Sequence, residues 1–138
     1  MERILKSIWV ITVTVWLVGC AHNSVTQSTK FTPVIHVVLL QFKPEVTPQQ
    51  IDQTIEQSIR QLRRIDGVIS VEAGVKVRDD RPVHIKDYQA GILVKLRDTA
   101  VLDRYGSDPI HQAFLQQHQA LFAKIQVLDF ASTVLAEP

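Results

Sequence analysis

The sequence predicts an α+β domain in which helices cover one face of a four-stranded antiparallel sheet. The chain has 138 residues, which is enough for one compact domain and too few for two. Four segments rich in β-branched and aromatic residues are typical of strands; they span 34–43, 68–77, 88–96 and 125–132. Segments with apolar residues at helical spacing separate the first strand from the second and the third strand from the fourth.

The first strand and the first helix carry clear boundary signals. The strand 34–43 lies between two prolines and is apolar on both faces, which indicates a largely buried strand. Thr47 then offers an N-cap, with proline at the first helical position and Gln50 at the third, the arrangement of a capping box. Gly67 supplies a left-handed stop. We therefore expect a helix over 48–66.

The second strand, 68–77, alternates between apolar and polar residues, as a half-buried strand does. Its apolar side chains are expected on one face of the sheet: Ile69, Val71, Ala73, Val75 and Val77. The charged segment 78–87 is a loop, and the third strand, 88–96, follows it.

The second helical stretch is broken in two. Asp98 or Thr99 can cap a short helix that ends at Gly106. Asp108, followed by proline, starts another helix that extends to about Ala123, because an acidic N-cap and a proline at the first position favour a helix start. The fourth strand closes the domain.

The resulting order, β-α-β-β-α-β, is the split βαβ of ferredoxin-like folds. Its helices cover one face of the sheet and leave the other uncovered. An apolar face without helices requires another partner, and the first strand is apolar on both sides. We therefore predict a homodimer through the sheet faces; one side of the strand carries Ile35, Val37 and Leu39, and the other carries Val34, Val38, Leu40 and Phe42.

Residues 1–19 have the three-part layout of a secretory signal. Arg3 and Lys6 precede an apolar run, and small residues lead to Cys20. The alternative is a transmembrane anchor, but the uncharged run 7–19 is shorter than the ~20 residues that span a bilayer.

The segment LVGC, residues 17–20, resembles the lipobox of bacterial lipoproteins, in which the cysteine becomes the lipidated N-terminus. This resemblance implies that Cys20, the only cysteine of the chain, carries acyl chains that anchor the protein to a membrane. Ala21 after it, rather than aspartate, implies the outer membrane, with the protein facing the periplasm. The polar segment 20–33 is then a flexible tether, and the folded domain occupies 34–134.

Charge and motifs exclude several classes of function. The chain has 15 basic and 14 acidic residues, and loss of the signal leaves equal numbers of each. A neutral domain lacks the basic surface that a nucleic-acid partner requires. No phosphate-binding loop or serine nucleophile motif is present, and we expect no cofactor.

A metal site is not expected either. His111 and His118 lie two helical turns apart, roughly 10 Å along the axis, which is too far for one ion. His84 lies among acidic residues that are able to hold a weak hard cation, but a solvated loop explains them equally.

The stretch RYGSDPIHQAF, residues 104–114, has two explanations. His111 is chemically suited to act as a general base and Tyr105 to polarise a carbonyl. Alternatively, Asp108 caps the helix by accepting the backbone N–H of His111, and Tyr105 only buries its ring. His36 shares a strand face with aliphatic residues, so it is either a satisfied core histidine or part of the same cavity as His111.

Four segments together resemble the stress-responsive dimeric α/β-barrel family, known as Dabb: HVVLLQFKPEVT, IDGVISVEAG, YQAGILVKL and YGSDPIHQAF. The resemblance implies two ferredoxin-like protomers packed sheet against sheet. In cyclase-like members a tyrosine and a histidine act in a pocket between helices and sheet, and Tyr105 and His111 fall on those two positions. The family pattern there is Y-x-x-H-P-x-H, and the position of its first histidine is occupied by Asp108 in this chain.

Three functions are consistent with the sequence. The first is a membrane-anchored α/β-barrel lipoprotein that binds a small apolar molecule in a pocket lined by His36, Tyr105 and His111. The second is a cofactor-free cyclase or isomerase that uses His111 and Tyr105 as an acid–base pair. The third is a purely structural envelope protein, which predicts that these rings pack without a void.

Overall fold

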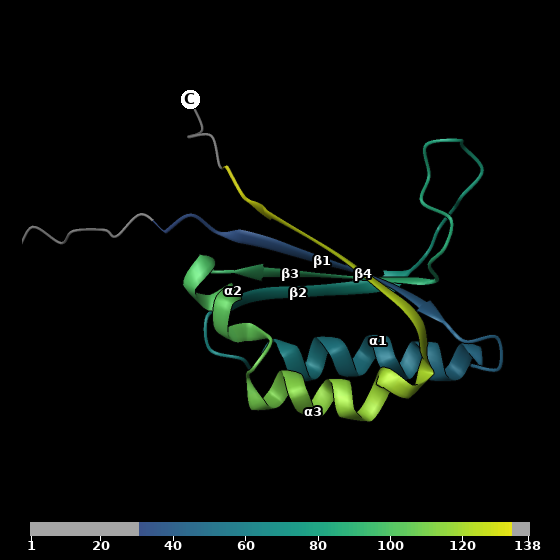
Figure 1. The fold of residues 1–138 in the computed structure, drawn as a ribbon, viewed down its shortest axis with the longest axis horizontal. Helices are drawn as coiled ribbons and strands as arrows, with labels where there is room; N and C mark the ends of the chain where they lie inside the picture. The colour runs from purple at the N-terminus through teal and green to yellow at the C-terminus, as the bar shows by residue number, and fades with distance from the viewer. Residues whose placement is uncertain (1–30, 134–138) are drawn as a thin grey trace, which may run out of the picture.

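The computed structural model describes residues 31–133 as a sheet with helices on one side (Figure 1). The strands are β1 (Val34–Phe42), β2 (Val68–Val75), β3 (Ala90–Leu96) and β4 (Phe122–Ala131). The helices are α1 (Pro48–Leu62), α2 (Thr99–Tyr105) and α3 (Pro109–His118), and a 3₁₀ turn, Gln119–Leu121, joins α3 to β4. The predicted signal 1–19 and the lipidation site Cys20 lie outside the described residues. None of the described helices is long and apolar enough to cross a membrane.

The four strands form one antiparallel sheet in the order β2-β3-β1-β4. Helices α1 and α3 lie against one face, and the opposite face is open (Figure 1). This arrangement confirms the predicted ferredoxin-like α+β fold. The register places His36 of the central strand β1 opposite Val94 of β3 and Asp129 of β4.

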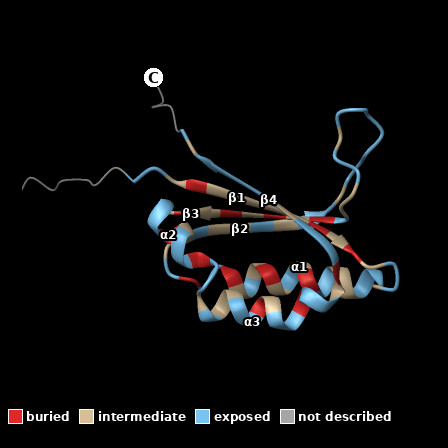
Figure 2. Ribbon diagram, viewed as in Figure 1, coloured by how far each residue is buried: buried red, intermediate tan, exposed pale blue. Residues whose placement is uncertain are grey.

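The core lies between the sheet and the helices (Figure 2). Alternate residues of β1 and β3 point toward the helices, as the two-residue period of a strand requires. Each large aliphatic side chain that leaves water here contributes about 1.5–3 kcal/mol to folding. The buried set includes Val34, Leu40, Phe42, Ile92, Val94, Leu96, Leu62, Val101 and Phe114.

Helix α1 begins as predicted and ends earlier than predicted. The Thr47 backbone N–H donates to Gln50 Oε1 at 2.9 Å, and the Gln50 backbone N–H donates to Thr47 Oγ1 at 3.3 Å, which completes the capping box. The helix ends at Leu62 because the next turn tightens, with the Ile65 N–H donating to the Leu62 carbonyl. Gly67 then adopts a φ of 88°, the left-handed conformation that glycine favours.

Strand β2 departs from the predicted alternation. A register shift between Val68 and Ser70 indicates a bulge, and the extra residue of a bulge is left unpaired. Ile69 is therefore exposed, whereas Val68 packs against the core. The loop after β2 is also longer than predicted. We call residues 76–89 the arm; it projects away from the sheet on the side opposite the helices (Figure 1).

The second helical region is capped as predicted, with one difference in detail. Asp98 accepts the Val101 backbone N–H at 2.9 Å and so caps α2. Asp108 caps α3 by accepting the backbone N–H of Ile110 at 2.8 Å. The sequence analysis predicts the N–H of His111 instead, so the donor lies one residue earlier than predicted. Helix α3 ends at its tenth residue, short of the predicted boundary, because the chain tightens into a 3₁₀ turn before β4.

Candidate functional site

A cavity of about 350 Å³ lies between the helix-facing side of the sheet and the α2–α3 region. Its wall is mostly apolar, and one part of it carries the three side chains predicted to line a pocket: His36, Tyr105 and His111. The structure therefore places all three around one cavity. The apolar wall includes Val38, Ile92, Leu102, Phe114, Ile125 and Val127.

Three separate elements position these three rings. His36 comes from the middle of β1, Tyr105 is the last residue of α2, and His111 lies in the first turn of α3. The centroids of the His36 and Tyr105 rings are 5.4 Å apart, and those of Tyr105 and His111 are 4.7 Å apart. Tyr105 thus lies between the two imidazoles. The short connection at residues 106–108 is what brings the last two rings together.

The hydrogen bonds of His111 fix its tautomer. Its Nδ1 lies 3.2 Å from the carbonyl oxygen of Gly106, and a carbonyl oxygen only accepts, so Nδ1 must carry the proton. The Nε2 atom then keeps a free lone pair. Burial lowers the pKa of His111, and the bond to Gly106 offsets part of that effect. A neutral imidazole with a free Nε2 is the form that a general base requires.

His36 is held by an acidic partner that the sequence analysis missed. Its Nδ1 lies 2.6 Å from Oδ1 of Asp129, directly across the β1–β4 pair. A carboxylate also only accepts, so Nδ1 of His36 donates this hydrogen bond. The His36 side chain is only 12% exposed. The signal that could have revealed Asp129 is that it is the one carboxylate in the mostly apolar strand β4.

Tyr105 remains protonated in this environment. Its ring is buried, and burial raises the pKa of its hydroxyl above the ordinary value, with the nearby Asp108 adding to the rise. A phenol that keeps its proton can donate a hydrogen bond to a carbonyl oxygen. The cavity therefore combines a neutral imidazole acceptor with a phenolic donor.

His118, which the sequence placed on the same helix, lies elsewhere. It is buried in the contact between α1 and α3, with Nε2 3.0 Å from Gln57 Oε1 and Nδ1 3.3 Å from Thr54 Oγ1. Burial lowers its pKa. His118 therefore serves helix packing rather than the cavity.

Nothing in the described part of the chain is arranged to hold a metal ion. No group of three or more histidine, cysteine, aspartate or glutamate side chains comes together within residues 31–133. His84, the candidate in the charged loop, instead receives a hydrogen bond from Nε of Arg81 at Nε2, at 3.0 Å.

Fold and site together define a ferredoxin-like α+β domain with a largely apolar cavity between its sheet and helices. Residues 34–132 match the model of the stress responsive A/B barrel domain. The chain therefore belongs to the stress-responsive A/B barrel domain family, as the four motifs predicted. No curated protein matches the sequence significantly.

Solved structures share this fold at low sequence identity. A protein from Arabidopsis thaliana is 22% identical with a TM-score of 0.65, covering 75% of this chain and 99% of its own. The hydroxynitrile lyase from Passiflora edulis is 16% identical with a TM-score of 0.65, covering 77% and 98%. A protein of unknown function from Thermobifida fusca, described as dimeric and ferredoxin-like, is 19% identical with a TM-score of 0.63, covering 75% and 93%. At these identities the likeness concerns the fold.

Proposed function

We propose that this protein binds a small, largely apolar molecule that carries a carbonyl group, in the cavity between sheet and helices. One observation carries the proposal: His36, Tyr105 and His111 surround an open space of about 350 Å³. A purely structural role for these residues predicts packed rings without a void, so the cavity counts against that alternative. Small-molecule sites typically combine apolar walls with a few convergent polar groups.

The polar groups favour a neutral ligand with a hydrogen-bond acceptor. Tyr105 keeps its proton because burial raises its pKa, so it donates. The Nε2 atom of His111 accepts, since burial lowers the pKa of His111 and its Nδ1 proton is held by the carbonyl of Gly106. A carbonyl compound with an acidic C–H beside the carbonyl matches this pair of one donor and one acceptor.

The remaining parts of the proposal concern anchoring and assembly. We place the mature protein on the outer membrane, facing the periplasm, through lipid on Cys20. We also propose a homodimer through the open sheet face, where Leu128 and Phe130 are exposed. A single open four-stranded sheet cannot close a barrel, and similar structures from Thermobifida fusca and Bacteroides fragilis are described as dimeric.

The same geometry supports a second candidate, a cofactor-free enzyme of the cyclase or isomerase type. Nε2 of His111 would remove a proton from the carbon beside the carbonyl, while the Tyr105 hydroxyl donates to the oxygen on which negative charge develops. The enolate that forms is then reprotonated on carbon by the His111 imidazolium, so no oxidant or metal is required. Correctly placed acid–base groups contribute about 10²–10⁴-fold in rate.

An NMR titration with 2-heptanone tests binding and catalysis together. This probe has an apolar tail and exchangeable protons beside a single carbonyl. In a chain lacking residues 1–20, we expect it to shift the resonances of His111 and Tyr105. If it is turned over, its exchange with D₂O will be faster than in buffer, and Tyr105→Phe or His111→Gln will remove the acceleration.

Matched variants outside the cavity provide the control. His84→Gln and Tyr88→Phe change the same residue types in the arm and should leave both readouts unchanged. Binding without exchange would support the binder and exclude this enzymatic step for the probe. If neither 2-heptanone nor a panel of phenols and β-dicarbonyl compounds moves His111 or Tyr105, the proposal fails.

A further inference from the structure

The cavity of the proposed function is elongated, and its polar side chains lie together at one end. Its sheet wall follows His36, Val38 and Leu40 along one face of β1, and these residues span about 13 Å at about 3.3 Å per residue. Tyr105 lies between His36 and His111 at the start of this span. The lining side chains at the other end, which we call the apolar end, are Leu40, Phe122 and Ile125.

One long side of the cavity is open to solvent along the edge strand β4. Ile125 and Val127 line the cavity and are the direct partners of Leu40 and Val38 on β1. They face the helix side of the sheet, yet they are 44% and 52% exposed, whereas Leu40 is 2% exposed. We call the opening beside Ile125 and Val127 the mouth. Because its apolar wall is half exposed, the cavity is not closed there.

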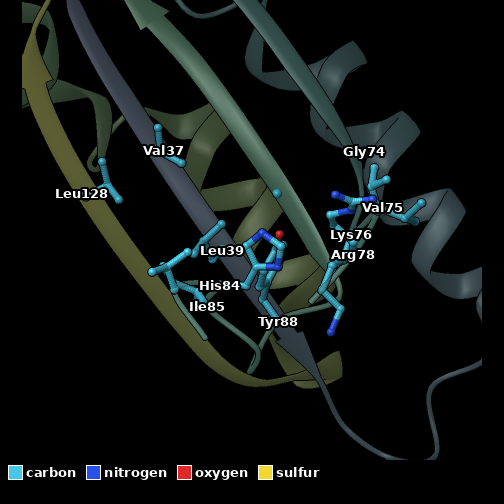
Figure 3. A pocket seen from close by; sticks show the side chains of 13 residues that line it. Val37, Leu39, Gly74, Val75, Lys76, Arg78, His84, Ile85, Tyr88 and Leu128 are labelled. Carbon is cyan, nitrogen blue, oxygen red and sulfur yellow. The ribbon is translucent and has the colours of Figure 1, made fainter. Parts of the chain in front are cut away.

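The cavity has no charged side chain placed to hold an anionic group. No lysine, arginine, aspartate or glutamate lines it. Burial lowers the pKa of His111, and His36 is already paired with Asp129. The hollow on the open face of the sheet differs, because Figure 3 shows Lys76 and Arg78 among its lining side chains. Burying a carboxylate without a partner is costly, so the cavity favours a neutral head group.

We infer that the ligand is a long-chain aliphatic ketone or aldehyde, with its carbonyl at Tyr105 and His111 and its tail running along β1 and out through the mouth. The inference rests on the proposed function and specifies the class of molecule that the same cavity takes. A compact ligand at the polar end would leave the apolar end to water, whereas an alkyl tail displaces that water and so gains affinity.

The span of the cavity sets the tail lengths that distinguish these cases. An extended alkyl chain advances about 1.25 Å for each bond of about 1.5 Å. A tail of three bonds from the carbonyl, as in 2-pentanone, therefore stops short of Val127, which lies about 7 Å along the sheet from the level of His36. A tail of nine bonds, as in 2-undecanone, reaches the apolar end beside Ile125.

NMR titrations with 2-pentanone, 2-heptanone and 2-undecanone test the inference. The chain lacking residues 1–20 is suitable because the core contains no residue before Val34. We expect all three ketones to shift the resonances of His111 and Tyr105, and only 2-undecanone to shift the methyl resonances of Ile125. The dissociation constant should fall about fourfold for each methylene that enters the cavity. It should not rise again for 2-undecanone, because the mouth is open.

A variant at the mouth and a matched control locate the tail. Ile125→Thr keeps a β-branched side chain on the strand and removes apolar surface from the mouth. It should weaken 2-undecanone by about fourfold or more and leave 2-pentanone within about twofold. Ile69→Thr changes an equally exposed isoleucine that does not line the cavity, and it should alter neither ketone. Undecanoate, with the same number of carbons, should bind at least about tenfold more weakly than 2-undecanone.

The outcomes separate this inference from the proposed function. If neither these ketones nor the phenols and β-dicarbonyl compounds move His111 or Tyr105, both fail. If 2-heptanone binds but 2-undecanone binds no more tightly or leaves Ile125 unperturbed, the inference alone is overturned, as it is if only the phenols or β-dicarbonyl compounds bind. An equal effect of Ile125→Thr on 2-pentanone and 2-undecanone would refute the path of the tail, and equal affinity for undecanoate would refute the neutral head group.

Discussion

Replacing Gly67 by alanine should destabilise the fold through two additive effects that a second substitution separates. Gly67 has a φ of 88°, and a residue with a Cβ loses about 1–2 kcal/mol in the left-handed region. That Cβ would also overlap Cγ2 of Val101 and lie 2.9 Å from its Cγ1. Overpacking a buried site costs about 1–3 kcal/mol. We expect Gly67→Ala to lower the free energy of unfolding by about 2–5 kcal/mol.

Val101→Ala removes the two methyl groups that the new Cβ would strike. Val101 is fully buried, so its truncation should cost about 2 kcal/mol by itself. In that background only the 3.2 Å approach to Val101 Cβ is left, so Gly67→Ala should cost little more than the backbone part, about 1–2 kcal/mol. The difference between the two backgrounds is a coupling energy of about 1–3 kcal/mol. It reports the contact between the turn before β2 and helix α2, which carries Tyr105 at its end.

Urea unfolding followed by far-UV circular dichroism measures all four members of this cycle, at one protein concentration because a dimer's stability depends on it. Gly106→Ala is the matched control, since nothing lies within 4 Å of its Cβ position. It should change stability by less than about 0.5 kcal/mol. The reasoning is refuted if Gly67→Ala costs less than about 1 kcal/mol, or if its cost is the same with and without the Val101 methyl groups.

Three further predictions concern the anchor, pH and a helix cap. Cys20→Ser should release the protein from membranes or block its processing; a processed variant that still fractionates with membrane would show that Cys20 is not the anchor. Acidification below about pH 6.5 should lower the free energy of unfolding, because burial depresses the pKa of His118 while the unfolded chain binds the proton at its ordinary pKa. For this histidine, the free energy of unfolding should change with pH by at most about 1.4 kcal/mol per pH unit. His118→Gln should reduce this change, measured by urea titrations at about pH 5 and about pH 7; an equal change in wild type and variant would contradict the role of His118. Asp98→Ala should cost about 1 kcal/mol because it removes the cap of α2, whereas Asp103→Ala in the same helix should be near neutral; equal losses would argue against the cap.

Local signals in the sequence determined the order of the elements and the positions at which the helices begin. Thr47 and Gln50 predicted the start of α1 because a capping box uses only neighbouring residues, and Asp98 and Asp108 predicted the next two helix starts. The nearly continuous apolar run of β1 likewise predicted a strand that is apolar on both faces. The four family motifs, read in order, then predicted the fold that the structure and the family match confirm.

Contacts between distant segments decided what the sequence left open. The bulge that exposes Ile69 depends on the pairing of β2 with β3, and no residue near Ile69 in the chain predicts this shift in register. The pairing of His36 with Asp129 depends on the β1–β4 register, which sets residues 93 positions apart face to face. The cavity exists because α2 and α3 meet the sheet at a distance set by packing. Sequence alone thus determined the order of the elements and where each helix begins, since capping signals are local. Only the tertiary structure decided which side chains share a cavity, since that depends on contacts between segments far apart in the chain.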